Sequence, residues 1–270
     1  MNPPVNLPTN TELIRLDLRL RRRMLIGTAI GTAAYLALIV AIYPSFRHDT
    51  SLDAMITANP TAAAAFGITG SITSPAGWLG ANMYANFGPL LALLLTVGYG
   101  AAAIAGQDTD GLLGLEATLP VTRTNVALQK ALTLLLIALV VPAVSLAACL
   151  TGPHFELNPD LTALLQVTLA MALLAFDIGA AALLVGAFTG SRGAALATAS
   201  TFAAAAYLVS SLAPVSQPIH DARWLSPFFW AVGNNQLAHG VGLGSLAALG
   251  GLGLVLTSAT IPAFRRLDIH

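Results

Sequence analysis

Six long apolar stretches alternate with shorter, more polar segments along the chain. Crossing a hydrocarbon core of about 30 Å takes about 20 helical residues, and each stretch is close to that length or longer. Backbone groups of an isolated strand would stay unpaired in lipid, so the stretches predict helices. We expect one all-α transmembrane domain over residues 1–270, with six spans at about 24–43, 85–105, 131–150, 161–188, 194–212 and 241–263.

The composition agrees with a chain that lies mostly in lipid. Hydrophobic residues make up 56% and charged residues only 9%, whereas a soluble domain carries about 25% charged residues. Cys149 is the single cysteine, and the five histidines show no ligand spacing, so we expect no disulfide framework and no metal site. We also expect no nucleic-acid partner.

The basic residues indicate how the chain is threaded. With the N-terminus inside, only Arg47 and Arg223 fall on the outer face. The other ten lie on the inner face: Arg15, Arg19, Arg21, Arg22, Arg23, Arg123, Lys130, Arg192, Arg265 and Arg266. This asymmetry predicts that both termini are cytoplasmic. The excess of arginine over lysine and the abundance of alanine suggest a bacterial protein, hence the bacterial inner membrane.

The segment before the first span mixes leucine with arginine. Thr9 and Glu12 have the spacing of a capping box, which predicts a helix start. We expect an interfacial amphipathic helix over residues 9–23, with Arg15, Arg19 and Arg22 on its polar face. The alternative is a basic tail that sets topology and has no further role.

The segment Gly106–Lys130 lies between the second and third spans and has an unusual pattern. It opens with acids, continues with a short apolar run, and turns at Leu119-Pro120. Proline disfavours a helical residue before it, so one short helix should end there. A helix of about two turns is too small to be a domain, and it has a suitable shape to bind in a groove on another protein.

The same segment resembles one found in permease subunits of ABC exporters, the type-2 ABC permeases. Gly111, Leu113 and Leu119-Pro120-Val121-Thr122-Arg123 match the family pattern. The resemblance extends to Ser74–Leu79, Leu225–Phe228 and Phe264–Arg266, and so to most of the chain. The acid that usually starts the short helix is replaced here by Gly114, and the nearest acid is Glu116.

The resemblance implies a short cytoplasmic coupling helix that docks on a separate ATP-binding subunit. The expected docking residues are Asp108, Asp110, Leu112, Leu113, Leu115, Glu116 and Arg123. The acids alternatively form a solvated loop start. The chain has no phosphate-binding loop, so ATP and Mg belong to the partner ATPase, present in two copies, and this chain holds no cofactor. The other partners are the lipid bilayer and a second permease, identical or homologous.

Asp177 is the one ionisable residue inside a predicted span. A carboxylate at mid-bilayer costs about 2.5–3.5 kcal/mol on insertion scales, so it should face protein or water. One interpretation places Asp177 in a translocation path, with Gln166 as a second polar residue of the fourth span. The other has it hydrogen-bonded to polar groups of a neighbouring helix, such as Gln166 or a serine or threonine of the fifth span.

The connection before the last span contains a further apolar run. Residues 224–232 are too few to cross a membrane, Pro227 divides them, and Asn234, Asn235 and Gln236 follow. This pattern predicts a re-entrant hairpin on the outer side, and the alternative is an ordinary extracellular loop.

Two functions are consistent with these features. The first is the membrane-spanning permease subunit of an ATP-driven exporter, which forms its path as a dimer and is coupled through residues 108–121. The second is a secondary carrier or channel without an ATPase, which would use Asp177. A carrier predicts more intramembrane polar residues or an internal duplication, and neither is visible. The substrate does not follow from the sequence.

Overall fold

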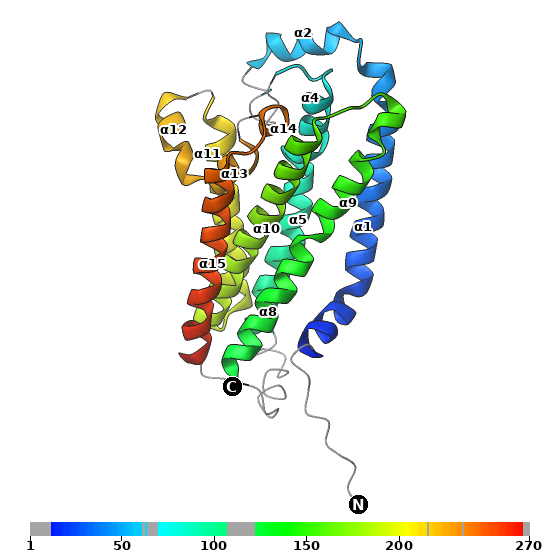
Figure 1. The fold of residues 1–270 in the computed structure, drawn as a ribbon. Helices are drawn as coiled ribbons and strands as arrows, with labels where there is room; N and C mark the ends of the chain where they lie inside the picture. The colour runs from blue at the N-terminus through cyan, green and yellow to red at the C-terminus, as the bar shows by residue number, and fades with distance from the viewer. Residues whose placement is uncertain are drawn as a thin grey trace, which may run out of the picture.

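The computed structural model describes residues 12–60, 63, 70–106, 122–214, 216–233 and 235–266. Within these residues every regular element is a helix, and six helical segments are long and apolar enough to cross a membrane. The all-α polytopic fold predicted from the apolar pattern is therefore confirmed. The spans run side by side, with short helices gathered at one end of the bundle (Figure 1).

Several of the six spans are built from more than one helix. The first is α1 (Glu12–Phe46). The second joins α4 (Pro75–Leu79), the π-helix η1 (Gly80–Tyr84), α5 (Phe87–Ala101) and the π-helix η2 (Ala102–Gly106). The third joins α8 (Arg123–Ala138) and α9 (Val140–Cys149). The remaining spans are α10 (Leu161–Thr189), α11 (Arg192–Leu212) and α15 (Leu243–Arg266).

The connections at the end opposite Glu12 and Arg266 are short helices. α2 (Thr50–Ala58) follows the first span, and the 3₁₀ helix η3 (Gly152–Phe155) links the third and fourth spans. Between α11 and α15 lie α12 (Gln217–Ala222), η4 (Arg223–Leu225), α13 (Pro227–Val232) and α14 (Gln236–His239). We call this the outer end, following the predicted threading.

The N-terminal segment and the first span form one helix. The sequence predicted an interfacial helix over 9–23 and a separate span from residue 24, but α1 continues unbroken from Glu12 to Phe46. The only proline of α1, Pro44, lies near its end. Nothing in Arg21–Ile26 interrupts helical hydrogen bonding, because the segment holds neither proline nor a capping residue.

α10 is the central helix of the bundle. It packs against α5, α15, α11 and α9, and small and aliphatic residues are buried all around it. In the most apolar 18-residue stretch of α10, 67% of the residues are buried inside the protein, compared with 22% in the corresponding stretches of α1 and α15. A helix that is apolar on every side is the type expected inside a bundle, with lipid-facing helices around it.

The contact between α5 and α10 depends on glycine. A Cβ atom placed on Gly100 would lie 2.2 Å from the carbonyl oxygen of Gly179, and one placed on Gly179 would lie 2.8 Å from Cβ of Thr96. Glycines on both helices therefore allow the backbones to approach closely, as small residues do in membrane helix pairs.

A proline explains the division of the third span. Pro142 lies in the first turn of α9, so it offers no amide hydrogen to the carbonyl of Ala138, the last residue of α8. The proline ring also crowds that carbonyl, which breaks the regular ladder. The span predicted over 131–150 is thus observed as two helices joined at Leu139.

The outer end is held to the second span by the carboxylate of Asp53 on α2. Its oxygens accept hydrogen bonds from the side chains of Ser71 (2.9 Å) and Thr73 (2.8 Å) and from the amides of Ile72 (2.8 Å) and Thr73 (3.4 Å). Burial raises the pKa of Asp53, but the bonds from Thr73, Ser71 and Ile72 outweigh it, so the pKa lies below its ordinary value of 3.8.

This depressed pKa gives a testable pH dependence. A lowered folded pKa contributes stability that is present above the unfolded value and is lost as pH falls through the folded value. We therefore expect the wild type to unfold at a higher temperature than Asp53→Asn at neutral pH, with the difference shrinking once the pH falls below 3.8. Thermal unfolding at a series of pH values measures this, and a difference that stays constant with pH would contradict it.

Candidate functional site

The predicted docking segment lies outside the described residues. Asp108, Asp110, Leu112, Leu113, Leu115 and Glu116 all fall within 107–121. The structure describes the two residues that flank this range, Gly106 and Thr122, and the contacts that hold them.

One flank of the segment is buried in the bundle, and the other caps a helix. Gly106 is buried at the end of η2, where a Cβ atom would lie 3.5 Å from Cδ of Arg192 at the start of α11. On the other side, the hydroxyl of Thr122 accepts a hydrogen bond from the amide of Asn125 (3.3 Å) and so caps α8. Both flanks are thus parts of the helix bundle.

Arg123 joins the start of α8 to the end of α15. Its guanidinium donates to the carbonyl oxygens of Phe264 and Arg265, each at 3.3 Å, and lies over the Phe264 ring. In return, the guanidinium of Arg265 donates to the hydroxyl of Thr124 at 2.8 Å. A movement of the α8 start therefore acts directly on α15.

A buried ion pair joins the start of α1 to α8. The ammonium of Lys130 lies 3.1 Å from a carboxylate oxygen of Asp17, and the hydroxyl of Tyr99 on α5 donates to the same oxygen at 2.7 Å. Asp17 and Lys130 are only 4% and 1% exposed. The paired charges and the tyrosine hydroxyl satisfy one another where water is excluded, as buried charges require.

Sequence reasoning missed this cluster, because Asp17 was placed in a surface helix and Lys130 on the inner face. Two signals pointed to it. Asp17 is the one acid among the arginines of residues 15–23, and Lys130, the one lysine of the chain, directly precedes an apolar stretch.

The predicted polar face of the N-terminal segment is observed on α1. Arg15, Arg19 and Arg22 are exposed, whereas Arg21 is partly buried with its guanidinium 4.9 Å from the centre of the Tyr99 ring. The first three turns of α1 thus turn Asp17 inward and leave most of the arginines outside.

Asp177 and Gln166 are not brought together by α10. They are eleven residues apart, which is about 16 Å along a helix. The side-chain oxygen of Gln166 accepts a hydrogen bond from the amide of Val241 (2.9 Å) and so holds the chain just before α15. Gln166 is therefore engaged at the outer end, away from Asp177.

Asp177 lies between α10 and α15 and is 1% exposed. Neither carboxyl oxygen has a hydrogen-bond partner among the described residues, so the hydrogen-bonded alternative finds no support there. A Cβ atom on Gly253 of α15 would lie 2.7 Å from one of these oxygens. Asp177 thus packs directly against the α15 backbone.

The residues around Pro227 form short helices that pack on the outer end of the bundle. Ser226 caps α13, which begins at Pro227, and the Ser226 hydroxyl also donates to the carbonyl of Ala206 on α11 (2.6 Å). The Gln236 amide donates to the carbonyls of Phe229 and Trp230, which ties α14 to α13. Asn234 lies outside the described residues, and the re-entrant path stays a prediction.

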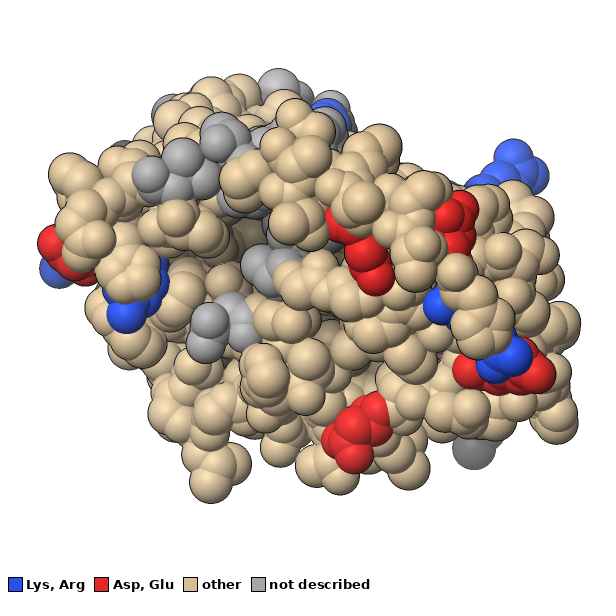
Figure 2. Space-filling model, turned by 90° about the horizontal axis from the view of Figure 1, so that it is seen from above, with Lys and Arg blue, Asp and Glu red and all other residues tan. Residues whose placement is uncertain are grey.

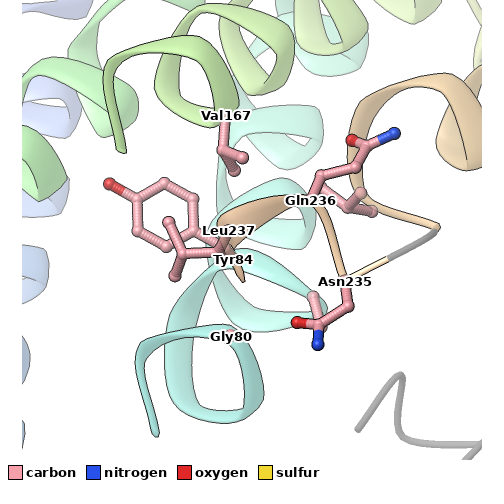
Figure 3. Close-up of a pocket in the computed structure, with 8 residues that line it drawn as sticks. Gly80, Tyr84, Val167, Asn235, Gln236 and Leu237 are labelled. Atoms are coloured by element: carbon pink, nitrogen blue, oxygen red, sulfur yellow. The ribbon is translucent and has the colours of Figure 1, made fainter. Parts of the chain in front are cut away.

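Asn235 has a left-handed backbone conformation (φ 49°), and it lines a small pocket at the start of α14. Figure 3 shows the labelled lining residues coming from η1, α10 and the start of α14. At about 20 Å³, the pocket has room for one water molecule and none for an organic ligand.

A larger, apolar groove lies between α5 and α11. It has a volume of about 400 Å³ and is lined by Leu94 and Val97 from α5, Ala203 and Tyr207 from α11, and Phe228 from α13. The Tyr207 hydroxyl donates to the side chain of Asn86, which links the two walls at the outer end. Sequence reasoning missed the groove, because its lining consists almost entirely of ordinary span residues.

Six apolar spans among the described residues define a multi-pass membrane protein. The family model described as "ABC-2 family transporter protein" matches residues 12–239. The chain belongs to this family, and the resemblance to type-2 ABC permeases is confirmed. It is therefore a membrane permease of an ABC transporter. A comparison with curated proteins found no match.

Proposed function

We propose that this chain is the permease subunit of an ATP-driven exporter and is coupled to separate ATP-binding subunits through residues 108–121. Two ATP-binding subunits would bind ATP and Mg, and this chain would bind neither. Their closure would push on the coupling segment and move the spans. ATP hydrolysis would belong to the partner chains.

The anchoring of both flanks of residues 107–121 carries this proposal. Gly106 is buried beside Arg192, and Arg123 is bonded to the end of α15. Lys130, two turns into α8, is paired with Asp17 of α1. A load on the segment would thus be passed to α5, α8, α15 and α1 together, as a coupling element requires.

The charge distribution supports a cytoplasmic position for the coupling segment. The ten basic residues of the predicted inner face lie in the terminal turns of α1, α8, α11 and α15, at the same end of the bundle as Glu12 and Arg266 (Figure 1). Figure 2 shows the outer end, where charged side chains are few and scattered. By the positive-inside rule, both termini would face the cytoplasm of a bacterial cell.

The groove between α5 and α11 supports a dimer. In the most apolar stretch of α11, only 28% of the residues are buried inside the protein. Together with α5, this helix forms the apolar groove of about 400 Å³. A second permease, identical or homologous, would cover this face and complete a path between the two subunits. The volume is within the range of about 300–1,000 Å³ typical of small-molecule sites.

Purification of the tagged chain from its native membranes in mild detergent tests the proposal. We expect an ATP-binding subunit to co-purify in stoichiometric amount and to be lost from the double variant Leu113→Asp, Leu115→Asp. Met55→Asp is the control, because it places a negative charge at an exposed apolar position of α2, at the outer end. Mass spectrometry of the complex also counts the permease copies.

Recovery of the chain without any ATPase, from every detergent tried, would overturn the proposal. The second function, a carrier or channel, would then be favoured by the buried carboxyl of Asp177, which has no hydrogen-bond partner among the described residues. Equal ATPase recovery with wild type and with Leu113→Asp, Leu115→Asp would keep the ATPase partner but reject residues 108–121 as its docking segment.

A further inference from the structure

The first three turns of α1 have three distinct faces. Leu13, Ile14 and Asp17 are buried against the bundle. On a helical wheel of about 100° per residue, four exposed arginines fall within an arc of about 100°: Arg15, Arg19, Arg22 and Arg23. Beside them runs an exposed apolar stripe of Leu16, Leu20 and Met24, which are 47%, 68% and 43% exposed.

Among the residues that the structure describes, the arginine arc has no acidic partner. None of its four arginines makes a hydrogen bond or ion pair within the described part of the chain. Asp17, the nearest acid along the helix, is turned inward and paired with Lys130. Glu12, at the first described position, is the only other acid in these turns. The arc is thus a concentrated positive surface.

The unbroken helix fixes the depth of this surface. With the predicted span starting near Met24 and α1 unbroken, Arg19 would lie five residues, or about 8 Å along the helix, before the hydrocarbon region. That distance corresponds to the headgroup layer, since the headgroups add several ångströms on each side of a core of about 30 Å. The apolar stripe follows the same turns beside the arginines, and its members Leu20 and Met24 lie nearest the hydrocarbon region.

We propose that Arg15, Arg19, Arg22 and Arg23 bind the headgroups of anionic phospholipids, while Leu16 and Leu20 contact the upper parts of the acyl chains. Guanidinium groups bind phosphate oxygens through paired hydrogen bonds. Each arginine close to an anionic membrane surface strengthens lipid binding by about fivefold. The site goes beyond the proposed coupling to an ATPase and does not rest on it.

The apolar stripe favours a lipid over a soluble ligand. A free phosphate would use the arginines but would leave Leu16 and Leu20 exposed. Arginines on one face of the first turns of α1, with leucines beside them, share the residue pattern of amphipathic lipid-binding helices. A lipid occupies both faces, with its phosphate on the arginines and its chains on the leucines.

Lipid competition on the purified full-length chain tests this proposal. The protein is exchanged into equal amounts of phosphatidylglycerol and phosphatidylcholine, and the retained lipids are counted by native mass spectrometry. We expect phosphatidylglycerol to predominate on the wild type. In Arg15→Gln, Arg19→Gln, Arg22→Gln this preference should fall by at least tenfold, and high salt should weaken it in the wild type.

Arg47→Gln, Arg223→Gln is the matched control, because it removes the two basic residues of the outer end, and it should keep the preference. Monodisperse elution and an unchanged unfolding temperature show that each variant is folded. Inorganic phosphate added at the lipid concentration should not displace phosphatidylglycerol. The proposal is overturned if the triple variant keeps the preference, if free phosphate abolishes it, or if the triple variant loses only a co-purifying protein.

Discussion

Replacing Lys130 with methionine is expected to destabilise the folded protein by about 3–5 kcal/mol, the usual cost of removing one partner of a buried ion pair. Methionine matches the length of the lysine stem but leaves the Asp17 carboxylate buried with no ammonium beside it. The Tyr99 hydroxyl alone cannot compensate for that charge. The unfolding temperature in one detergent, compared between variant and wild type, measures the effect.

A double variant distinguishes the contribution of the ion pair to stability from that of side-chain packing. In Asp17→Asn, Lys130→Met no charge is left buried, so most of the lost stability should return, and the coupling between the two sites should be large. Arg266→Met is the matched control, because Arg266 is exposed and the same replacement there should cost little. Additive losses from Asp17→Asn and Lys130→Met would show that the two side chains contribute independently.

Gly100→Ala is expected to lower stability by at least about 1–3 kcal/mol, the cost of overpacking a filled interior. The added methyl group would meet the carbonyl oxygen of Gly179 at 2.2 Å, and neither this oxygen nor the Gly100 backbone can move freely, because both lie inside helices. α5 and α10 must then separate, and α10 is the centre of the bundle. Thermal unfolding and the yield of monodisperse protein measure the loss.

Gly98→Ala is the matched control, two residues away on the same helix. No heavy atom lies within 4 Å of its added methyl group, so the substitution should leave stability unchanged or raise it slightly through helix propensity. Equal losses from Gly98→Ala and Gly100→Ala would mean that helix flexibility, rather than the α5–α10 contact, explains the effect.

The apolar pattern was sufficient to predict the six spans, because the bilayer imposes a minimum length and full helical hydrogen bonding. It could not predict where spans are divided. The break at Leu139 follows from Pro142, which a membrane helix also tolerates without breaking. The extension of the second span to Pro75 depends on how Trp78 and Tyr84 pack against other helices.

The candidate site could be predicted less well than the fold. Exposure of Arg15, Arg19 and Arg22 followed from the amphipathic pattern. The Asp17–Lys130 pair joins residues 113 positions apart, and no local pattern encodes such a contact. Gln166 and Asp177 belong to the same span, but they are eleven residues apart and so lie at different depths. Gln166 accepts a hydrogen bond from Val241, whereas Asp177 packs against Gly253. The docking role of residues 108–116 stays a prediction.

The continuity of α1 has a mechanical consequence. Its 35 residues make a rod of about 52 Å, which exceeds the hydrocarbon core by about 22 Å. The helix is held near both ends. Lys130 pairs with Asp17 near its start, and the Trp78 indole donates a hydrogen bond to the carbonyl of Ile39 nearer its end. Between Arg22 and Gly31 no side chain is buried. A tilt imposed at the Asp17 end of this rod would therefore displace its Ile39 end directly, without passing through the α5–α10 core.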